Sequence, residues 1–121
     1  MGSKIIAANK SVAAIAKQID KYYQTHGEWP RELDNSWFRS RNYPRSPFVP
    51  DYPGNTVNIN DSPNKWHPGY KALGTYPPFW YCRGNGTIRI RVPPQESNAA
   101  TLALYNAANQ TNAKSLSDQS M

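Results

Sequence analysis

The chain has 121 residues, a length that suits one domain and is short for two. Only 38% of the residues are hydrophobic and eleven are proline, a composition that argues against a dense helical bundle and predicts a small core with long irregular segments. The formal net charge of +6 favours anionic partners such as nucleic acid, phospholipid or acidic polysaccharide, although ordinary surface charge for solubility explains it equally well.

An amphipathic helix is predicted over residues 4–26. Its apolar residues recur at alternating spacings of three and four, which places them on one stripe: Ile5, Ala8, Val12, Ile15, Ile19 and Tyr22. Lys10, Lys17 and Lys21 fall on the opposite side, so the helix is expected to be half exposed and half buried. Gly27 and Pro30 end it, because glycine adopts the left-handed conformation that closes a helix and proline cannot continue one.

Residues 27–78 are predicted to form one long ordered loop, since Pro, Asn, Asp and Ser dominate and no helical period lasts more than a turn. Structureless loops of this length are uncommon in compact domains, so the aromatic residues of the segment are expected to pin it to the helix. These residues are Trp29, Trp37, Phe38, Tyr43, Phe48, Tyr52, Trp66 and Tyr70. A short strand is expected inside the loop, around residues 56–59.

A β-hairpin is predicted over residues 79–92, with a turn at Gly84-Asn85-Gly86, whose residues accept positive φ. Alternation along the second strand sends three apolar side chains to one face: Ile88, Ile90 and Val92. It sends three polar side chains to the other: Thr87, Arg89 and Arg91. The first face is expected to pack on the helix and the second to meet solvent.

These elements predict an α+β fold, in which the N-terminal amphipathic helix packs on a small antiparallel sheet beside a long loop rich in aromatic residues and proline. Residues 98–108 are expected to add a short helix and residues 109–121 a polar, flexible tail, so that 4–108 form a single domain. Residues 1–3 are interpreted as an addition for recombinant expression, with native sequence starting near Lys4. No apolar run approaches the roughly 18 residues of a membrane span, and no signal peptide is recognised.

No catalytic or metal-binding pattern is found, so neither an enzyme activity nor a cofactor or metal is predicted. His26 is interpreted as a favourable charge at a helix C-terminus, and His67 stands alone in a loop. Cys82, the single cysteine, excludes an intramolecular disulfide and is expected to be a small buried hydrophobic residue. The glycines of the hairpin turn lead into a strand, whereas phosphate-binding loops lead into a helix.

One segment interleaves cations with aromatic rings, as in surfaces that clamp phosphates and stack bases. Its candidate anion or nucleic-acid contacts are Trp37, Arg39, Arg41, Tyr43 and Arg45, joined by Arg89 and Arg91 from the hairpin. Lys71 and Arg83 could extend this basic face. The simpler alternative is that the aromatic residues anchor the loop while the arginines lie over them and pair with acidic residues, in this chain or in a neighbouring subunit.

Two stretches carry a resemblance to a known family. The helix contains Ile15, Gln18, Ile19, Tyr22 and Tyr23 and is followed by the sequence His-Gly-Glu-Trp-Pro over residues 26–30. This stretch resembles the segment that follows the membrane anchor in type IV pilin-like proteins, and the major pseudopilins of type II secretion systems are the most similar. The hairpin over residues 79–92 also looks like the glycine-turn hairpin of pseudopilin-like sequences. Residues between the two stretches match no family pattern.

The resemblance implies a prepilin that is cleaved and N-methylated at an apolar N-terminal helix. That helix would anchor the subunit in the inner membrane and later pack in the filament core. The implied partners are other pilin or pseudopilin subunits, as a homo- or heteropolymer, and the inner-membrane assembly platform. The implied location is the bacterial cell envelope, either as a periplasmic domain on a membrane anchor or in an extracellular filament. The chain lacks the cysteine pair and the calcium-binding acidic loop of some relatives, so no calcium site is carried over.

Two functions follow. The first is a structural filament subunit that assembles through its helix, with Ile5, Val12, Ile15, Ile19 and Tyr22 as packing and assembly residues. The alternative is a minor pilin that acts as a binding module, presenting the basic aromatic segment to DNA or polysaccharide.

Overall fold

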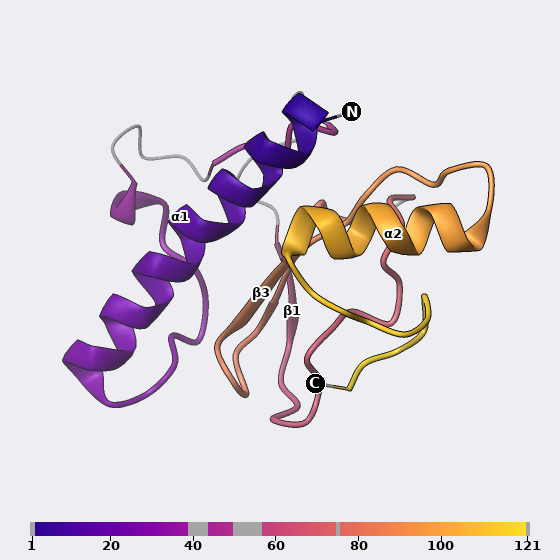
Figure 1. The fold of residues 1–121 in the computed structure, drawn as a ribbon. Coiled ribbons are helices and arrows are strands. Elements are labelled where there is room, and N and C mark those ends of the chain that lie inside the picture. The colour runs from indigo at the N-terminus through magenta and orange to yellow at the C-terminus, as the bar shows by residue number, and fades with distance from the viewer. Residues whose placement is uncertain (1, 39–43, 50–56, 75, 121) are drawn as a thin grey trace.

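The computed structural model describes residues 2–38, 44–49, 57–74 and 76–120 (Figure 1). In chain order its elements are the helix α1 (Gly2–His26), a short 3-10 helix (Asn35–Trp37), the strands β1 (Val57–Asn60), β2 (Phe79–Cys82) and β3 (Thr87–Ile90), and the helix α2 (Asn98–Asn109). The fold is therefore α+β, as the sequence predicted.

The predicted N-terminal helix is confirmed, and it begins two residues earlier than expected, at Gly2. Its interior contains no proline or glycine, and alanine is frequent, so local propensity agrees with the apolar stripe. Gly27 ends it with φ of 75° and donates its N–H to the Tyr23 carbonyl at 2.7 Å. That conformation and hydrogen bond are those of the glycine C-cap that the sequence indicated.

The three strands form one sheet in the order β1-β2-β3. The hairpin is confirmed, because β2 and β3 pair antiparallel with Cys82 opposite Thr87. The prediction of an antiparallel sheet is wrong for β1, which pairs parallel to β2 with Val57 opposite Phe79. A parallel neighbour needs a long crossover connection, and residues 61–78 supply it. Beyond β3, Val92 makes an isolated parallel bridge with Ala72.

The hydrophobic core lies between the sheet and the two helices. From β2 and β3 it takes Phe79, Tyr81, Ile88 and Ile90, which the strand register places on one face. α1 contacts both β3 and α2, and Figure 1 shows the C-terminal end of α2 approaching the first half of α1. The Asn9 side-chain amide joins them there, donating to the Ala108 carbonyl at 2.6 Å. α1 therefore holds the domain together along much of its length.

The predicted helix over 98–108 is confirmed and extends to Asn109. The Ser97 hydroxyl caps its start by accepting the Ala100 N–H at 3.1 Å, and Gln110 closes its end in the left-handed conformation with φ of 56°. Asn109 is buried, and its side-chain amide pairs with the outer edge of β3. It accepts the Ile90 N–H at 2.8 Å and donates to the Ile90 carbonyl at 2.9 Å, as a neighbouring strand would.

The second face of the sheet does not meet solvent, which corrects the sequence expectation. Arg91 is 2% exposed and Thr87 is also buried. Residues 66–71 and the C-terminal segment lie over this face, and the Trp66 N–H donates to the Gln119 carbonyl at 2.8 Å. The segment after α2, expected to be a flexible tail, instead packs on the domain and buries Ala113. Its backbone carbonyls accept hydrogen bonds from Trp66 and Lys71. Amino-acid composition does not reveal such contacts, because every residue has a backbone carbonyl.

Candidate functional site

The predicted packing stripe of α1 points mainly into its own domain. Ile15 and Ile19 are fully buried, whereas Ile5 and Val12 are partly buried against the same core. Tyr22 is half-buried, with its ring centroid 4.1 Å from that of His26 and 5.9 Å from that of Trp37. The packing of these residues in the described structure is therefore intramolecular.

A second stripe of α1 faces outward and lines a shallow groove of about 570 Å³. The groove is formed by Ala13, Ala16, Lys17, Asp20, Lys21 and Gln24. The small alanine side chains let another backbone approach closely, while the lysines and Asp20 offer charges at the rim. Nearer the N-terminus Ile6 is 58% exposed, the most exposed isoleucine of the helix. This face is the candidate assembly surface.

The exit of α1 is fixed to the hairpin. Trp29 packs on Tyr23 with ring centroids 4.0 Å apart and the ring planes tilted by 30°, and its ring covers Gly86 in the β2–β3 turn. Gly86 has φ of 76°, and a Cβ there would come within 2.4 Å of the Trp29 ring. A glycine is therefore required at this position by both its backbone conformation and the close ring.

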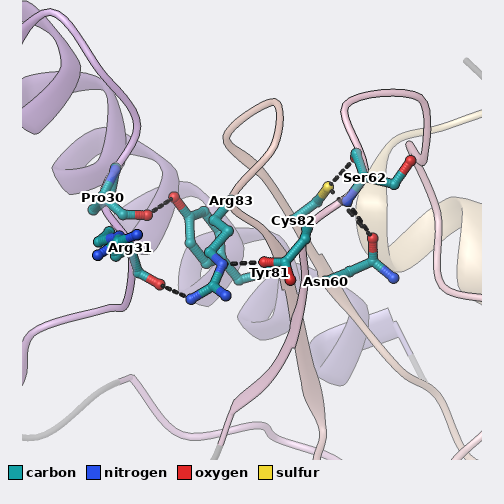
Figure 2. A network of polar contacts seen from close by, with 8 residues as sticks. Pro30, Arg31, Asn60, Ser62, Tyr81, Cys82 and Arg83 are labelled. Atoms are coloured by element: carbon teal, nitrogen blue, oxygen red, sulfur yellow. Dashed lines mark hydrogen bonds and ion pairs between the residues drawn. The ribbon is translucent and has the colours of Figure 1, made fainter.

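Polar contacts strengthen the same junction (Figure 2). The Tyr81 hydroxyl donates to the Pro30 carbonyl at 2.6 Å, and the Arg83 guanidinium donates to the Arg31 carbonyl at 3.2 Å. Arg83 also forms an ion pair with Asp61. Because Tyr81 is fully buried, this arrangement sets the direction in which the chain leaves the helix.

Among the predicted anion contacts that the structure describes, the residues do not gather on one open face. Arg39, Arg41 and Tyr43 lie outside the described residues. Trp37 packs against Tyr22, and Arg45 is exposed, with its carbonyl accepting the Ser11 hydroxyl at 3.1 Å. A nucleic-acid role for this loop stays a prediction.

The two hairpin arginines are occupied by internal hydrogen bonds. Arg91 donates to the Tyr70 carbonyl at 2.7 Å, the Pro77 carbonyl at 2.9 Å and the Asn58 side chain at 2.8 Å. Arg89 is half-buried and donates to the Trp66 carbonyl at 3.1 Å. Buried guanidinium groups need such partners; the crossing loop supplies most of them as backbone carbonyls, and β1 supplies the Asn58 side chain. This explains why a strand pattern alone misplaced them in solvent.

Sequence reasoning missed a buried polar cluster on the second face of the sheet, the face that carries Arg89 and Arg91. Lys71 is 1% exposed, and its ammonium donates to the carbonyls of Pro68, Leu116 and Asp118 at 3.1, 2.9 and 2.5 Å. Burial lowers the pKa of Lys71 to about 8. The ammonium thereby holds the C-terminal segment against the sheet. No motif marks these carbonyl partners, because any residue type can supply them.

His67 belongs to the same cluster. It is 4% exposed, and its Nδ1 lies 2.7 Å from the Tyr105 hydroxyl. Burial, followed by the positive charges of Arg89 and Lys71, lowers the pKa of His67 to about 4, from 6.5. The neutral ring is therefore the form that the folded protein prefers.

This preference predicts a loss of stability in mild acid. The unfolded chain binds a proton at His67 near pH 6.5 and the folded chain near pH 4, so stability falls as the pH drops through that window. A pKa difference contributes about 1.36 kcal/mol per unit to the free energy of unfolding, so protonation of His67 can lower that free energy by at most about 3 kcal/mol. We expect a loss of about 2 kcal/mol between pH 7 and pH 4. Chemical denaturation at pH 7 and pH 4 measures it.

The control for this experiment is His67→Asn, whose amide oxygen can accept the Tyr105 hydroxyl near the position of Nδ1 but does not titrate. This variant should lose at least 1 kcal/mol less than the wild type between pH 7 and pH 4. Asp118 titrates below the window, because hydrogen bonds led by the Ser120 hydroxyl hold its pKa below the usual range. Equal acid losses in the two proteins would contradict the assignment.

The last candidate for chemistry is the Cys82 thiol. Cys82 is fully buried, as predicted, and its thiol donates to the Ser62 carbonyl at 2.9 Å. Burial raises the pKa of the thiol, which works against a nucleophilic role. Among the described residues, no three His, Cys, Asp or Glu side chains lie close enough to hold a metal ion. In the same part of the chain, no helix is both long and apolar enough to cross a membrane.

Comparisons of the chain with family models, with curated proteins and with solved structures found no match. The function is therefore inferred from the fold and from the surfaces described above.

Proposed function

We propose that this chain is a structural subunit of a filament of the type IV pilus or type II secretion pseudopilus class, and that α1 is its assembly element. The observation that supports this proposal most is that α1 has one buried stripe and one exposed stripe. One stripe, represented by Ile15 and Ile19, is buried in the domain. Another, with Ala13, Lys17 and Gln24, lines an open groove on the outside.

A helix that packs on its own domain with one face and exposes a second face is suited to a subunit of a polymer. The inner face fixes the helix to its sheet, and the outer face can receive a different surface of a second copy. A contact between two different patches does not close into a dimer and can repeat to form an open filament. With 25 residues, α1 is about 37 Å long, which gives room for contacts with more than one neighbour.

In this proposal an apolar segment upstream of Lys4 continues α1. It anchors the subunit in the inner membrane before assembly and packs in the filament core afterwards. The remaining partners are other subunits of the filament and the inner-membrane assembly platform. The corresponding reading frame should encode about 20 apolar residues, enough to span a bilayer, preceded by a short basic leader that ends in glycine. A polar or unrelated upstream sequence would overturn the proposal.

A substitution on the groove tests the assembly surface directly. In cells that produce the full-length protein, Ala13→Arg should reduce filament number at least tenfold, because a long charged side chain fills the groove and must be desolvated on contact, a cost of more than about 1.4 kcal/mol. Electron microscopy of sheared filaments measures this. The matched control is Asn112→Arg, an exposed position after α2, which should assemble normally.

The interpretation requires that both variants fold as the wild type does. Thermal melts of the soluble domain should agree within about 2 °C, since each replaced residue is exposed. Normal filaments from Ala13→Arg, with a folded domain, would show that the groove is not part of the assembly contact.

A further inference from the structure

A second hollow lies at the C-terminal end of α1, on a stripe next to the groove at Ala13, and Lys21 lines both. Gln18, Lys21, Tyr22 and Thr25 are spaced by three or four residues and so share one side of the helix. Trp37, together with Ser36, closes the hollow from the short 3-10 helix. The space between them measures about 360 Å³ and is open to solvent.

The walls of this hollow are held in place by contacts of their own. The Tyr22 ring contacts those of His26 and Trp37. The Asp34 carboxylate accepts the Ser36 N–H at 2.9 Å and the Ser36 hydroxyl at 2.8 Å. These bonds, the backbone one first, hold the pKa of Asp34 below its usual range, so the carboxylate remains an acceptor. A ligand therefore meets a surface that is already ordered, which lowers the entropy lost on binding.

The lining combines aromatic surface with polar side chains, so it suits a ligand that has one apolar face and polar groups around its edge. Aromatic rings from Tyr22 and Trp37 offer a surface for C–H groups, and the Gln18 amide offers two donors and an acceptor. The Thr25 hydroxyl donates to the Lys21 carbonyl at 2.9 Å and keeps its own lone pairs for a ligand. A pyranose has an apolar C–H face and hydroxyl groups around its rim, and it matches this set.

The electrostatics of the site favour a neutral ligand over a nucleic acid. The hollow lies at the C-terminal end of α1, where unpaired carbonyls give the helix its negative pole. A nucleic acid needs a track of several cations along its phosphates, and the described lining contributes Lys21 and the imidazole of His26. We propose that this hollow is a binding subsite for a neutral pyranose unit of a glycan. The inference does not depend on filament assembly.

The test is a titration of the folded chain followed by two-dimensional NMR. The probes are two tetrasaccharides, one of β-1,4-linked glucose and one of β-1,4-linked N-acetylglucosamine. We expect saturable shifts for at least one probe, confined to residues 18–26 and the Trp37 indole. Trp37→Ala should weaken binding about tenfold, which corresponds to about 1.4 kcal/mol for one lost stacking contact. Trp37→Phe, which keeps an aromatic face, should restore most of the affinity.

A pair of glutamines on the same helix provides the matched control. Gln18→Ala removes an amide from the hollow and should weaken binding at least threefold. Gln24→Ala removes the same group from the other groove and should leave binding unchanged. Both substitutions are on the surface of α1, so this comparison stays informative if Trp37→Ala unfolds the domain.

Three outcomes would overturn the proposal. The first is the absence of saturable shifts with both tetrasaccharides. The second is equal weakening by Gln18→Ala and Gln24→Ala. The third is shifts in this hollow only with a single-stranded DNA oligonucleotide, with an affinity that falls steeply with salt and is lost in Lys21→Ala, which would identify an anion site instead.

Discussion

Replacing Asn109 by alanine is expected to lower the free energy of unfolding by about 3 kcal/mol, because two buried backbone groups lose their partners. The Asn109 amide accepts the Ile90 N–H and donates to the Ile90 carbonyl, and it also donates to the Tyr105 carbonyl at 3.0 Å. Asn109 is 8% exposed, so water cannot readily replace these bonds. Urea denaturation followed by circular dichroism measures the loss.

Two further measurements distinguish the loss of these hydrogen bonds from a non-specific loss of stability. Asn112→Ala, three residues later at an exposed position, should change stability by less than about 0.5 kcal/mol. Hydrogen exchange of the Ile90 amide should accelerate in Asn109→Ala beyond what the global loss accounts for. A loss below about 1 kcal/mol would show that water or a neighbouring group satisfies this strand edge.

The second large effect is expected at the centre of α1. Ile15→Ala should destabilise the domain by about 3 to 4 kcal/mol, because the side chain is fully buried between the helix and the sheet and its removal leaves a cavity. Ile6→Ala makes the same chemical change on the same helix at a site that is 58% exposed, and it should cost less than about 1 kcal/mol. Guanidinium denaturation of the two variants provides the comparison.

Similar losses for the two isoleucines would mean that α1 does not pack on the sheet through the stripe that contains Ile15. The pair also bears on the proposed function. Ile6→Ala should leave the isolated domain intact and still impair assembly if the exposed N-terminal turns of α1 contact another copy.

Local signals carried most of the successful predictions. The spacing of Ile15 and Ile19, the glycine at position 27 and the turn at residues 84–86 each act within a few residues, so the sequence contained enough information for α1 and the hairpin. The direction of β1 depends instead on how residues 61–78 cross the sheet. Residues 57–60 alternate apolar and polar side chains, a pattern typical of antiparallel strands, so nothing in the short strand marked its parallel orientation.

The surfaces were harder to predict than the elements. Arg91 alternates correctly along its strand, yet it is buried because three separate groups from distant segments reach its guanidinium. Half of the lining of the hollow beside α1 could be predicted from the sequence, because Gln18 and Thr25 fall on one stripe of the helix. Its other half, Trp37, reaches the site through a loop whose course no local pattern specifies. Contacts that join distant segments set both arrangements.

The junction between α1 and the hairpin also has a mechanical consequence. A pull along α1, of the kind that a retracting fibre would exert in the proposed function, reaches the rest of the domain through the buried stripe of the helix and through the exit segment (Figure 2). There the Pro30 and Arg31 carbonyls are held by Tyr81 and Arg83, and Tyr81 lies in β2, the middle strand of the sheet. Part of the load would thus enter at a strand that is paired on both sides, so the exit segment should resist extension better than one attached to an edge strand.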